Sequence, residues 1–309
     1  LHSRHAPTGW GNAYVKVGGS AFHKSLRIET IKPNRLKVDL DLGGHALAGG
    51  SRASARLTSS WLTGVPASGL NAHATMTLSR GASSFKGFDG YIFRNPAASF
   101  EASEHELFRT VLSADGTAEP AFNLPAAKDA PGLLSAFIVT SVEESGGDES
   151  FTTQTLPYSP FPTYVGVKFP SDGDLETGKD HTVRVAVVDA AGNRLSGRNL
   201  EYRVFKLQWS WWWEDNPDEL NSYVNGSEAR PVASGTLVSG AQDATFTLRA
   251  EAEEWGRYLV VVRDVAGGHV SGRTVIIDEP GYLGRAGRED PNALTMLTFL
   301  THKASTLAG

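Results

Sequence analysis

The sequence of 309 residues contains no cysteine. This absence excludes disulfides, thiolate catalysis and cysteine-based zinc sites, but it leaves the redox compartment open. No apolar run approaches the roughly 18 residues that a membrane-spanning helix needs. An excess of positive charge is also lacking: 29 Lys and Arg face 34 Asp and Glu, a net charge of −5. Because nucleic-acid-binding proteins carry clustered excess Lys and Arg, this balance argues against a nucleic-acid partner.

Motifs of catalysis and of metal binding are missing as well. The nine histidines are scattered, and the only close pair is His2 and His5. A zinc site needs three or four converging ligands, and the sequence contains no His-Glu-x-x-His motif. The acidic turns at Asp115 and at 172–174 match no EF-hand spacing, so turn formation is the preferred interpretation. Without a Gly-x-Ser-x-Gly elbow or a phosphate loop, we expect no catalytic, cofactor-binding or metal residues and no enzymatic activity.

What the sequence does contain is a series of glycine-containing segments, or landmarks, that occurs twice, in the same order. The segment GVPASG at 64–69 recurs as GNRLSG at 192–197. Gly116 recurs as Gly240, and Gly132 recurs as Gly256, each 124 residues later. Apolar residues follow each glycine of a pair at matching distances. A Gly-Gly pair at 146–147 corresponds to another at 267–268. Four landmarks in one order indicate a duplicated module.

The apolar residues of each module follow the period of β-strands. Val183, Val185 and Val187 alternate with polar or small residues, and turn sequences such as Asp115-Gly116 separate the apolar runs. No helical stripe is sustained. About seven short strands with turns between them predict an all-β chain of tandem antiparallel seven-stranded β-sandwiches.

The same alternation predicts which side chains form the two cores. In the first module we expect burial of Trp61, Leu78, Phe137, Val139 and Phe151. In the second module we expect burial of Val185, Val187, Val204, Phe246, Leu259 and Val261.

The landmarks also divide the chain. We place the modules at 27–157 and 158–278, joined by LPYSPFP at 156–162, whose three prolines predict a stiff linker. The start, WGNAYVKVGG at 10–19, resembles the end of a module, so 1–26 is expected to close a preceding one. Residues 279–309 are expected to be a linker and the first strand of the next module.

Each module has one irregular stretch after its third or fourth strand, at 80–101 and at 209–232. Loops carry module-specific contacts, so we expect interdomain or partner contacts here. The candidates are Tyr91, Phe93, Trp209, Trp211, Trp212 and Trp213. Alternating indoles could form a platform for sugars or a docking surface, but the preferred interpretation is structural, with at least two of the tryptophans mostly buried.

Several segments carry a family resemblance. They include RIETIKPNRL at 27–36, WLTGVPA at 61–67, YRVFKL at 202–207 with the following WSWWWE, and WGRY at 255–258. Together they resemble macroglobulin domains of bacterial alpha-2-macroglobulins, in a subtype seen in Bacteroidetes-like sequences. The resemblance implies fibronectin III/Ig-like sandwiches in a large inhibitor that traps endopeptidases.

In such proteins a bait segment is cut and a thioester often links to the protease, but no bait and no cysteine are present here. The resemblance therefore implies a non-catalytic scaffold segment without cofactor, whose partners are neighbouring macroglobulin domains and, for the full-length protein, proteases. It also implies a periplasmic or cell-surface protein, exported and lipid-anchored. The alternative is a binding module of a surface β-sandwich array that recognises carbohydrate or protein.

Overall fold

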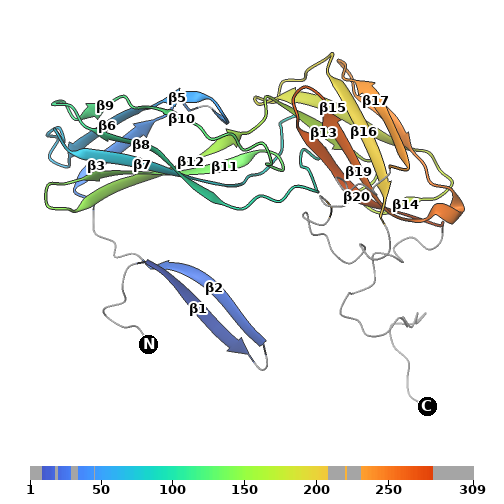
Figure 1. Cartoon of the computed structure of the whole chain (residues 1–309), viewed down its shortest axis with the longest axis horizontal. Helices are drawn as coiled ribbons and strands as arrows, with labels where there is room; N and C mark the ends of the chain where they lie inside the picture. The colour runs from blue at the N-terminus through green and yellow to red at the C-terminus, as the bar shows by residue number, and fades with distance from the viewer. Residues whose placement is uncertain are drawn as a thin grey trace.

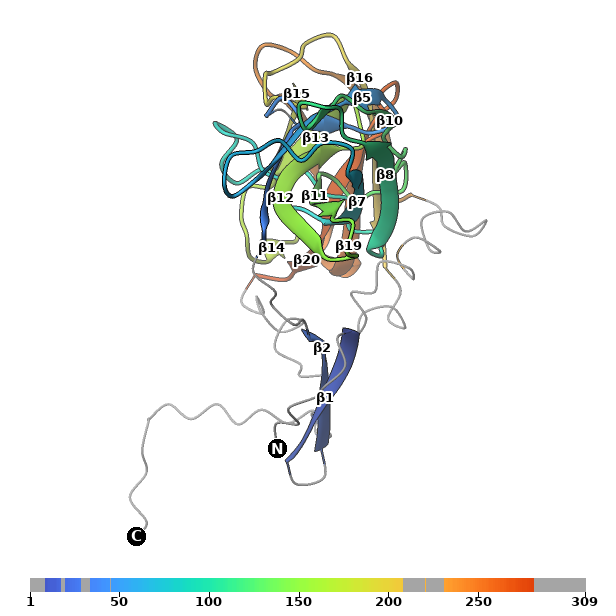
Figure 2. The ribbon, with the colours of Figure 1, turned by 90° about the vertical axis from the view of Figure 1, so that its left-hand side faces the viewer.

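The computed structural model describes residues 9–17, 20–28, 34–44, 46–207, 220 and 231–280. These residues form β-strands in two sandwiches that lie end to end along the long axis of the molecule (Figure 1). A separate hairpin, β1 (Gly9–Val17) with β2 (Ser20–Ile28), lies outside both sandwiches, as the view along the long axis also shows (Figure 2). The predicted all-β class is confirmed.

The first sandwich packs a three-stranded sheet on a five-stranded sheet. The smaller sheet has the order β3 (Leu36–Asp41), β6 (Arg56–Trp61), β9 (Thr117–Ala118). The larger sheet has the order β4 (Leu47–Ala48), β12 (Glu149–Ser159), β11 (Leu134–Glu143), β7 (Asn71–Arg80), β8 (Ser103–Val111). A small ribbon joins β5 (Arg52–Ser54) to β10 (Ala121–Asn123).

The second sandwich repeats this order. Its smaller sheet runs β13 (Thr163–Lys168), β15 (His181–Asp189), β18 (Ala244–Leu248). Its larger sheet runs β14 (Leu175–Glu176), β20 (Val270–Asp278), β19 (Gly256–Asp264), β16 (Asn199–Lys206), β17 (Ala233–Val238), and a 3-10 turn covers Ala252–Glu254.

The repeated order confirms the duplication inferred from the glycine landmarks. Within the described residues each sandwich has eight strands in its two sheets rather than seven, because a two-residue strand, β4 or β14, adds a parallel pairing to the long strand β12 or β20. The proposed boundaries at 27–157 and 158–278 stay predictions.

The repeated turn shows how closely the backbones agree. In the first sandwich the Trp61 N–H donates to the Val65 carbonyl at 2.7 Å, and in the second the Asp189 N–H donates to the Asn193 carbonyl at 2.9 Å. Both turns depend on a glycine with positive φ, 89° at Gly64 and 87° at Gly192, a conformation that favours a residue without a side chain. The segments GVPASG and GNRLSG therefore match because they close the same turn.

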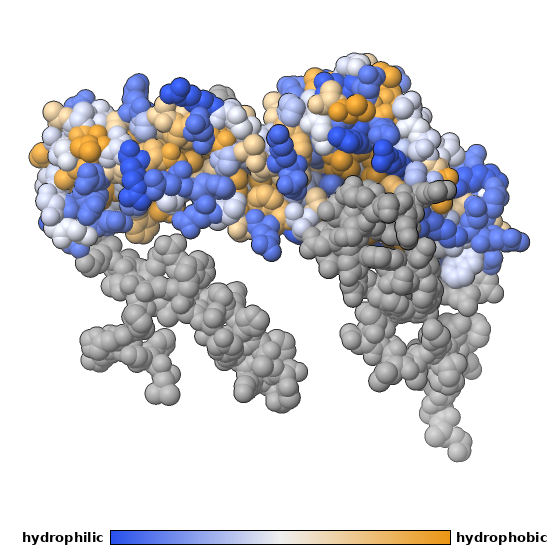
Figure 3. Space-filling view, viewed as in Figure 1, coloured by the Kyte–Doolittle hydropathy of each residue, from blue (hydrophilic) through white to orange (hydrophobic). Residues whose placement is uncertain are grey.

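The burial predictions hold in the second sandwich, although Leu259 and Val261 belong to a separate cluster on the outer face of β19, and they fail in part in the first. All six expected residues of the second sandwich are buried, and so is Leu78 of the first. The prediction was wrong for Phe137 and Phe151, which are 39% and 45% exposed, while Trp61 and Val139 are half-buried. On β11 the inward side chains are Leu134, Ala136 and Ile138, so the intervening residues face outward. Figure 3 shows apolar patches among hydrophilic residues on one face of the first sandwich.

Candidate functional site

The candidate site is the joint between the two sandwiches. The segment 81–101, which leaves β7 of the first sandwich and returns as β8, reaches across to the second sandwich, and we call it the strap. Two of its glycines, Gly87 and Gly90, have positive φ of 85° and 78°, which lets the chain reverse direction twice over a short distance.

An aromatic cluster fills the joint. Phe88 and Phe93 of the strap are buried together with Tyr164, Ala186 and Val188 on the outer face of β13 and β15, and Phe85 packs at its edge. The Phe85 and Phe93 rings meet edge to face with centroids 4.8 Å apart, and Phe85 lies 5.4 Å from Tyr164. Edge-to-face ring pairs of this kind stabilise the contact beyond the burial of apolar area.

Polar groups fix the rim of this cluster. The Tyr91 hydroxyl donates to the Asp243 carboxylate at 2.5 Å, and Arg194 pairs with the same carboxylate at 3.0 Å. The Arg194 guanidinium also lies 5.0 Å from the centre of the Phe88 ring. Burial, and then the hydrogen bond to Asp243, raise the pKa of Tyr91 to about 12. The phenol therefore stays protonated and remains a donor across the joint.

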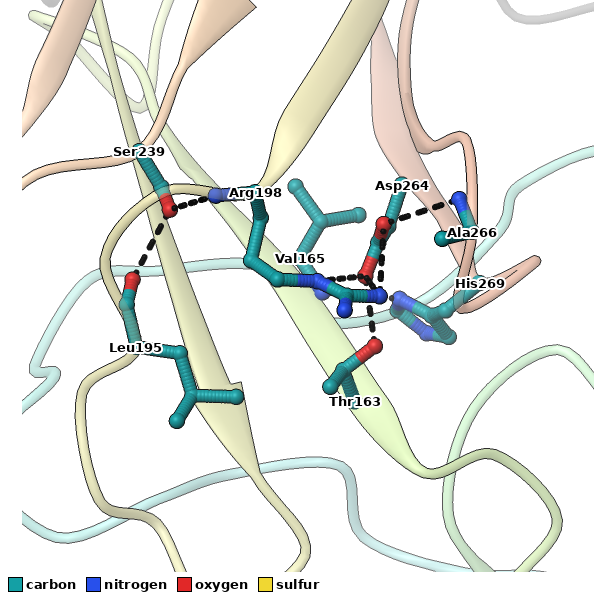
Figure 4. A network of polar contacts seen from close by, with 8 residues as sticks. All are labelled: Thr163, Val165, Leu195, Arg198, Ser239, Asp264, Ala266 and His269. Carbon is teal, nitrogen blue, oxygen red and sulfur yellow. Dashed lines mark hydrogen bonds and ion pairs between the residues drawn. The ribbon is translucent and has the colours of Figure 1, made fainter.

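A second polar network anchors β13 inside the second sandwich (Figure 4). The fully buried Asp264 carboxylate accepts from the Thr163 hydroxyl at 2.5 Å and from two nitrogens of Arg198 at 2.9 to 3.2 Å. Burial acts to raise the pKa of Asp264, but hydrogen bonds from Thr163, the Gly267 backbone and Arg198 lower it on balance. The carboxylate is therefore kept ionised in the sandwich interior.

His269 lies beside this network under the linker. Its Nδ1 accepts from the Val165 N–H at 3.0 Å, and its ring packs 5.1 Å from Phe161 and 4.9 Å from Tyr164. Burial lowers the pKa of His269 to about 3, so the imidazole is neutral at physiological pH.

The expected contact residues divide into two groups. Tyr91 and Phe93 both lie in the joint, Phe93 with 1% of its surface exposed. Trp209, Trp211, Trp212 and Trp213 lie outside the described residues, so their predicted burial is not addressed. From that part of the chain Leu220 is described, and it is buried against Phe205, Leu207, Leu259, Val261 and the strap residue Ala97.

Sequence reasoning missed Arg198, Asp264 and His269, although the repeat carried a signal for Asp264. Asp264 precedes the Gly-Gly turn 267–268 as Glu144 precedes 146–147, and each buried acid pairs with an arginine, Arg198 or Arg35. A comparison of the two hairpins would have identified both acids as structural partners.

The polar groups of the joint are engaged in hydrogen bonds and ion pairs. The Tyr91–Asp243 bond crosses between the two sandwiches, and the Thr163–Asp264 bond lies within the second. No group of three or more His, Asp or Glu that could hold a metal ion occurs in the described residues. No helix of the described part is long and apolar enough to cross a bilayer.

Two family models match the chain. Residues 34–160 match "Bacterial Alpha-2-macroglobulin MG5 domain", and residues 166–278 match "Bacterial macroglobulin domain 6". No curated protein matches the sequence.

Solved structures agree with these models on the fold. Trypsin-activated alpha-2-macroglobulin from Escherichia coli is similar with a TM-score of 0.56 and 16% identity over 89% of this chain and 19% of that one. The native conformation of the E. coli protein is similar with a TM-score of 0.53 and 16% identity, over 93% of this chain and 18% of that one. Salmonella alpha-2-macroglobulin reacted with methylamine is similar with a TM-score of 0.52 and 17% identity, over 88% of this chain and 18% of that one. The chain thus spans less than a fifth of the length of these proteins.

Proposed function

This chain belongs to the bacterial alpha-2-macroglobulin family, and we propose that it is a non-catalytic scaffold segment of a larger protein that traps endopeptidases. In this proposal the two sandwiches do not touch the scissile bond of any substrate. They hold a part of the frame within which a protease is enclosed.

The observation that carries the proposal is the interlocked joint. A frame must keep its shape under load, and tandem domains joined only by a linker move relative to one another by default. Here the linker 156–162 carries Pro160 and Pro162, and its Ser159 side chain shares a hydrogen bond with the Tyr164 hydroxyl at 2.8 Å. The aromatic cluster and the Tyr91–Asp243 bond add contacts that a flexible tandem array would not need.

Partners and location follow the same proposal. The neighbours would be further macroglobulin domains of the parent chain, and the targets of the full-length protein would be endopeptidases. A net charge of −5 supports a protein partner over nucleic acid. We also propose that the parent is exported to the periplasm or cell surface and lipid-anchored, on the strength of the family alone.

The test uses the longer protein in which this sequence stands. It is incubated with trypsin, and the cleavage of a large protein substrate and of a small peptide substrate are followed in parallel. Trapping predicts loss of activity on the large substrate while the small one is still cleaved.

Within that protein Phe93→Ala should lower the number of trypsin molecules trapped per inhibitor, because it loosens the frame. Phe137→Ala, an exposed phenylalanine of the first sandwich, is the matched control and should leave trapping unchanged. Equal cleavage of both substrates by trypsin, with or without the protein, would refute the proposal.

A further inference from the structure

We propose that one side of the second sandwich is an acceptor for an extended aromatic segment, and that residues 85–94 of the strap are its donor. The acceptor side lies between β13, the edge of the smaller sheet, and the Val270–Arg273 part of β20, where the larger sheet has no further strand. The second sandwich is then completed by a segment that the first sandwich supplies.

The main chain of the strap bonds to both sheets at this opening. Ile92 pairs with Val167 of β13 through two hydrogen bonds: the Ile92 N–H donates to the Val167 carbonyl at 2.8 Å, and the Val167 N–H donates to the Ile92 carbonyl at 3.0 Å. On the other side the Ser271 hydroxyl donates to the Ile92 carbonyl at 2.5 Å, and the Gly272 N–H donates to the Arg94 carbonyl at 3.1 Å. Strand addition of this kind takes its affinity from main-chain bonds and its specificity from side-chain pockets.

The side chains of the strap occupy such pockets. Ile92 packs against the core of the second sandwich, although it belongs to the first. Phe93 lies directly over Gly166, where any side chain would overlap its ring. Under the aromatic cluster Tyr164, Ala186 and Val188 have at most 1% of their surface exposed. Removal of the strap would leave this apolar face in water, which soluble domains avoid.

The first sandwich is an internal control, because the same face is polar there. The pairing of Leu36 with Trp61 corresponds to the pairing of Thr163 with Asp189, since the same turn follows each. Lys37 therefore stands in the place of Tyr164, and Asp39 in the place of Gly166. Both are exposed, so this face needs no cover.

The edge of the first sandwich is also closed by its own side chains. Leu40 corresponds to Val167, and its carbonyl accepts from the Gln154 side chain at 3.1 Å instead of from a donated strand. On the larger sheets Gln154 lies opposite Ile138 of β11, and Ser271 lies opposite Val262 of β19. A long side chain closes the gap in one sandwich, whereas the short serine bonds to the strap in the other.

The experiment measures amide hydrogen exchange over the whole chain in variants of donor and acceptor. Phe93→Ala removes the donor ring, and Gly166→Ala builds a methyl group into the space of that ring without altering the first sandwich. Either change should speed the exchange of β13 and β20 amides about a hundredfold, while β3 and β12 keep their protection. Phe137→Ala is the matched control and should change neither sandwich.

A synthetic peptide of residues 84–96, added to the Phe93→Ala chain, should restore the protection of β13 and β20, and a scrambled peptide should not. Protection lost mainly in β3 and β12 would show that the strap stabilises only its own sandwich and would overturn the proposal. Unchanged exchange in the Gly166→Ala chain, or failure of the native peptide to restore protection, would overturn it as well.

Discussion

His269 makes the joint sensitive to acid through a single buried side chain. Its pKa in the folded chain is about 3, against 6.5 for an ordinary histidine, because burial disfavours the imidazolium. Its contribution to stability is therefore complete above pH 6.5 and is lost as the pH falls from 6.5 towards 3. Within that window one such histidine removes about 1.4 kcal/mol per pH unit.

We expect His269→Asn to flatten the dependence of the free energy of unfolding on pH between 6.5 and 4.5. The asparagine retains an acceptor for the Val165 N–H but cannot gain a proton in this range. Urea unfolding followed by circular dichroism at several pH values measures the slope. His105→Asn, on β8 and away from the joint, is the control and should keep the wild-type slope. An unchanged slope in His269→Asn would show that other groups carry the acid sensitivity.

Arg198 offers a second prediction at the scale of one residue. Asp264 is fully buried and Arg198 is its cationic partner, so Arg198→Met leaves a buried carboxylate without a counter-charge. Breaking a buried pair from one side costs about 3–5 kcal/mol. Chemical denaturation should show this loss, and the double variant Arg198→Met, Asp264→Asn should recover part of it. If the two single changes were simply additive, the pair would contribute no coupling energy.

At the scale of the strand, β11 and β19 show how one misread register left Phe137 exposed in the first sandwich but Leu259 and Val261 buried in the second. Both strands are apolar at consecutive positions, LLSAFIV at 133–139 and YLVVV at 258–262, so alternation alone does not define the inward face. In β19 both faces are covered, because Leu220 and Ala97 bury Leu259 and Val261. In β11 no described residue covers the corresponding outer face to the same extent, and Phe137 is exposed.

The corrected register predicts a contrast between two phenylalanines. Phe246 is buried and stacks on Tyr202 with the ring centres 4.2 Å apart, so Phe246→Ala should lower the free energy of unfolding by about 3–5 kcal/mol. Phe137→Ala lies on the outer face and should change it by less than about 1 kcal/mol. Thermal unfolding of the two variants compares them directly. Equal losses would mean that something covers Phe137 in solution.

The strap marks the limit of what the sequence could predict. Strand order and turns followed from landmarks that repeat, and the irregular stretch 80–101 stood out because it does not repeat. The docking of the strap on β13 could not be predicted from the sequence. Tyr91 and Asp243 are 152 residues apart, and no local pattern encodes their contact. Gly166 was the available clue: a glycine in the middle of a strand marks a place where another group approaches closely.

At the scale of the whole molecule, linker and strap connect the two sandwiches at several points, so we expect the sandwiches to move as one body. Ser159 and Tyr164 hold the linker, while the strap bonds to β13 and β20. For a hinge to open at 157–163, the buried Phe93 would have to leave its place over Gly166. Bending of a longer protein should therefore occur outside the span 34–280.

The last prediction concerns activity: the 309-residue chain alone should neither inhibit nor cleave. Trapping in this family is expected to need a bait segment and enclosure by further domains, and this sequence has no recognisable bait and no cysteine for a thioester. A scaffold segment can stiffen a cage, but it cannot close one around a protease. The chain is incubated with trypsin, an elastase and a subtilisin-type protease, and the cleavage of large and small substrates is followed. Both should proceed at the rate of the protease alone. A stoichiometric loss of activity on large substrates would place the inhibitory element within these two sandwiches and overturn the scaffold proposal.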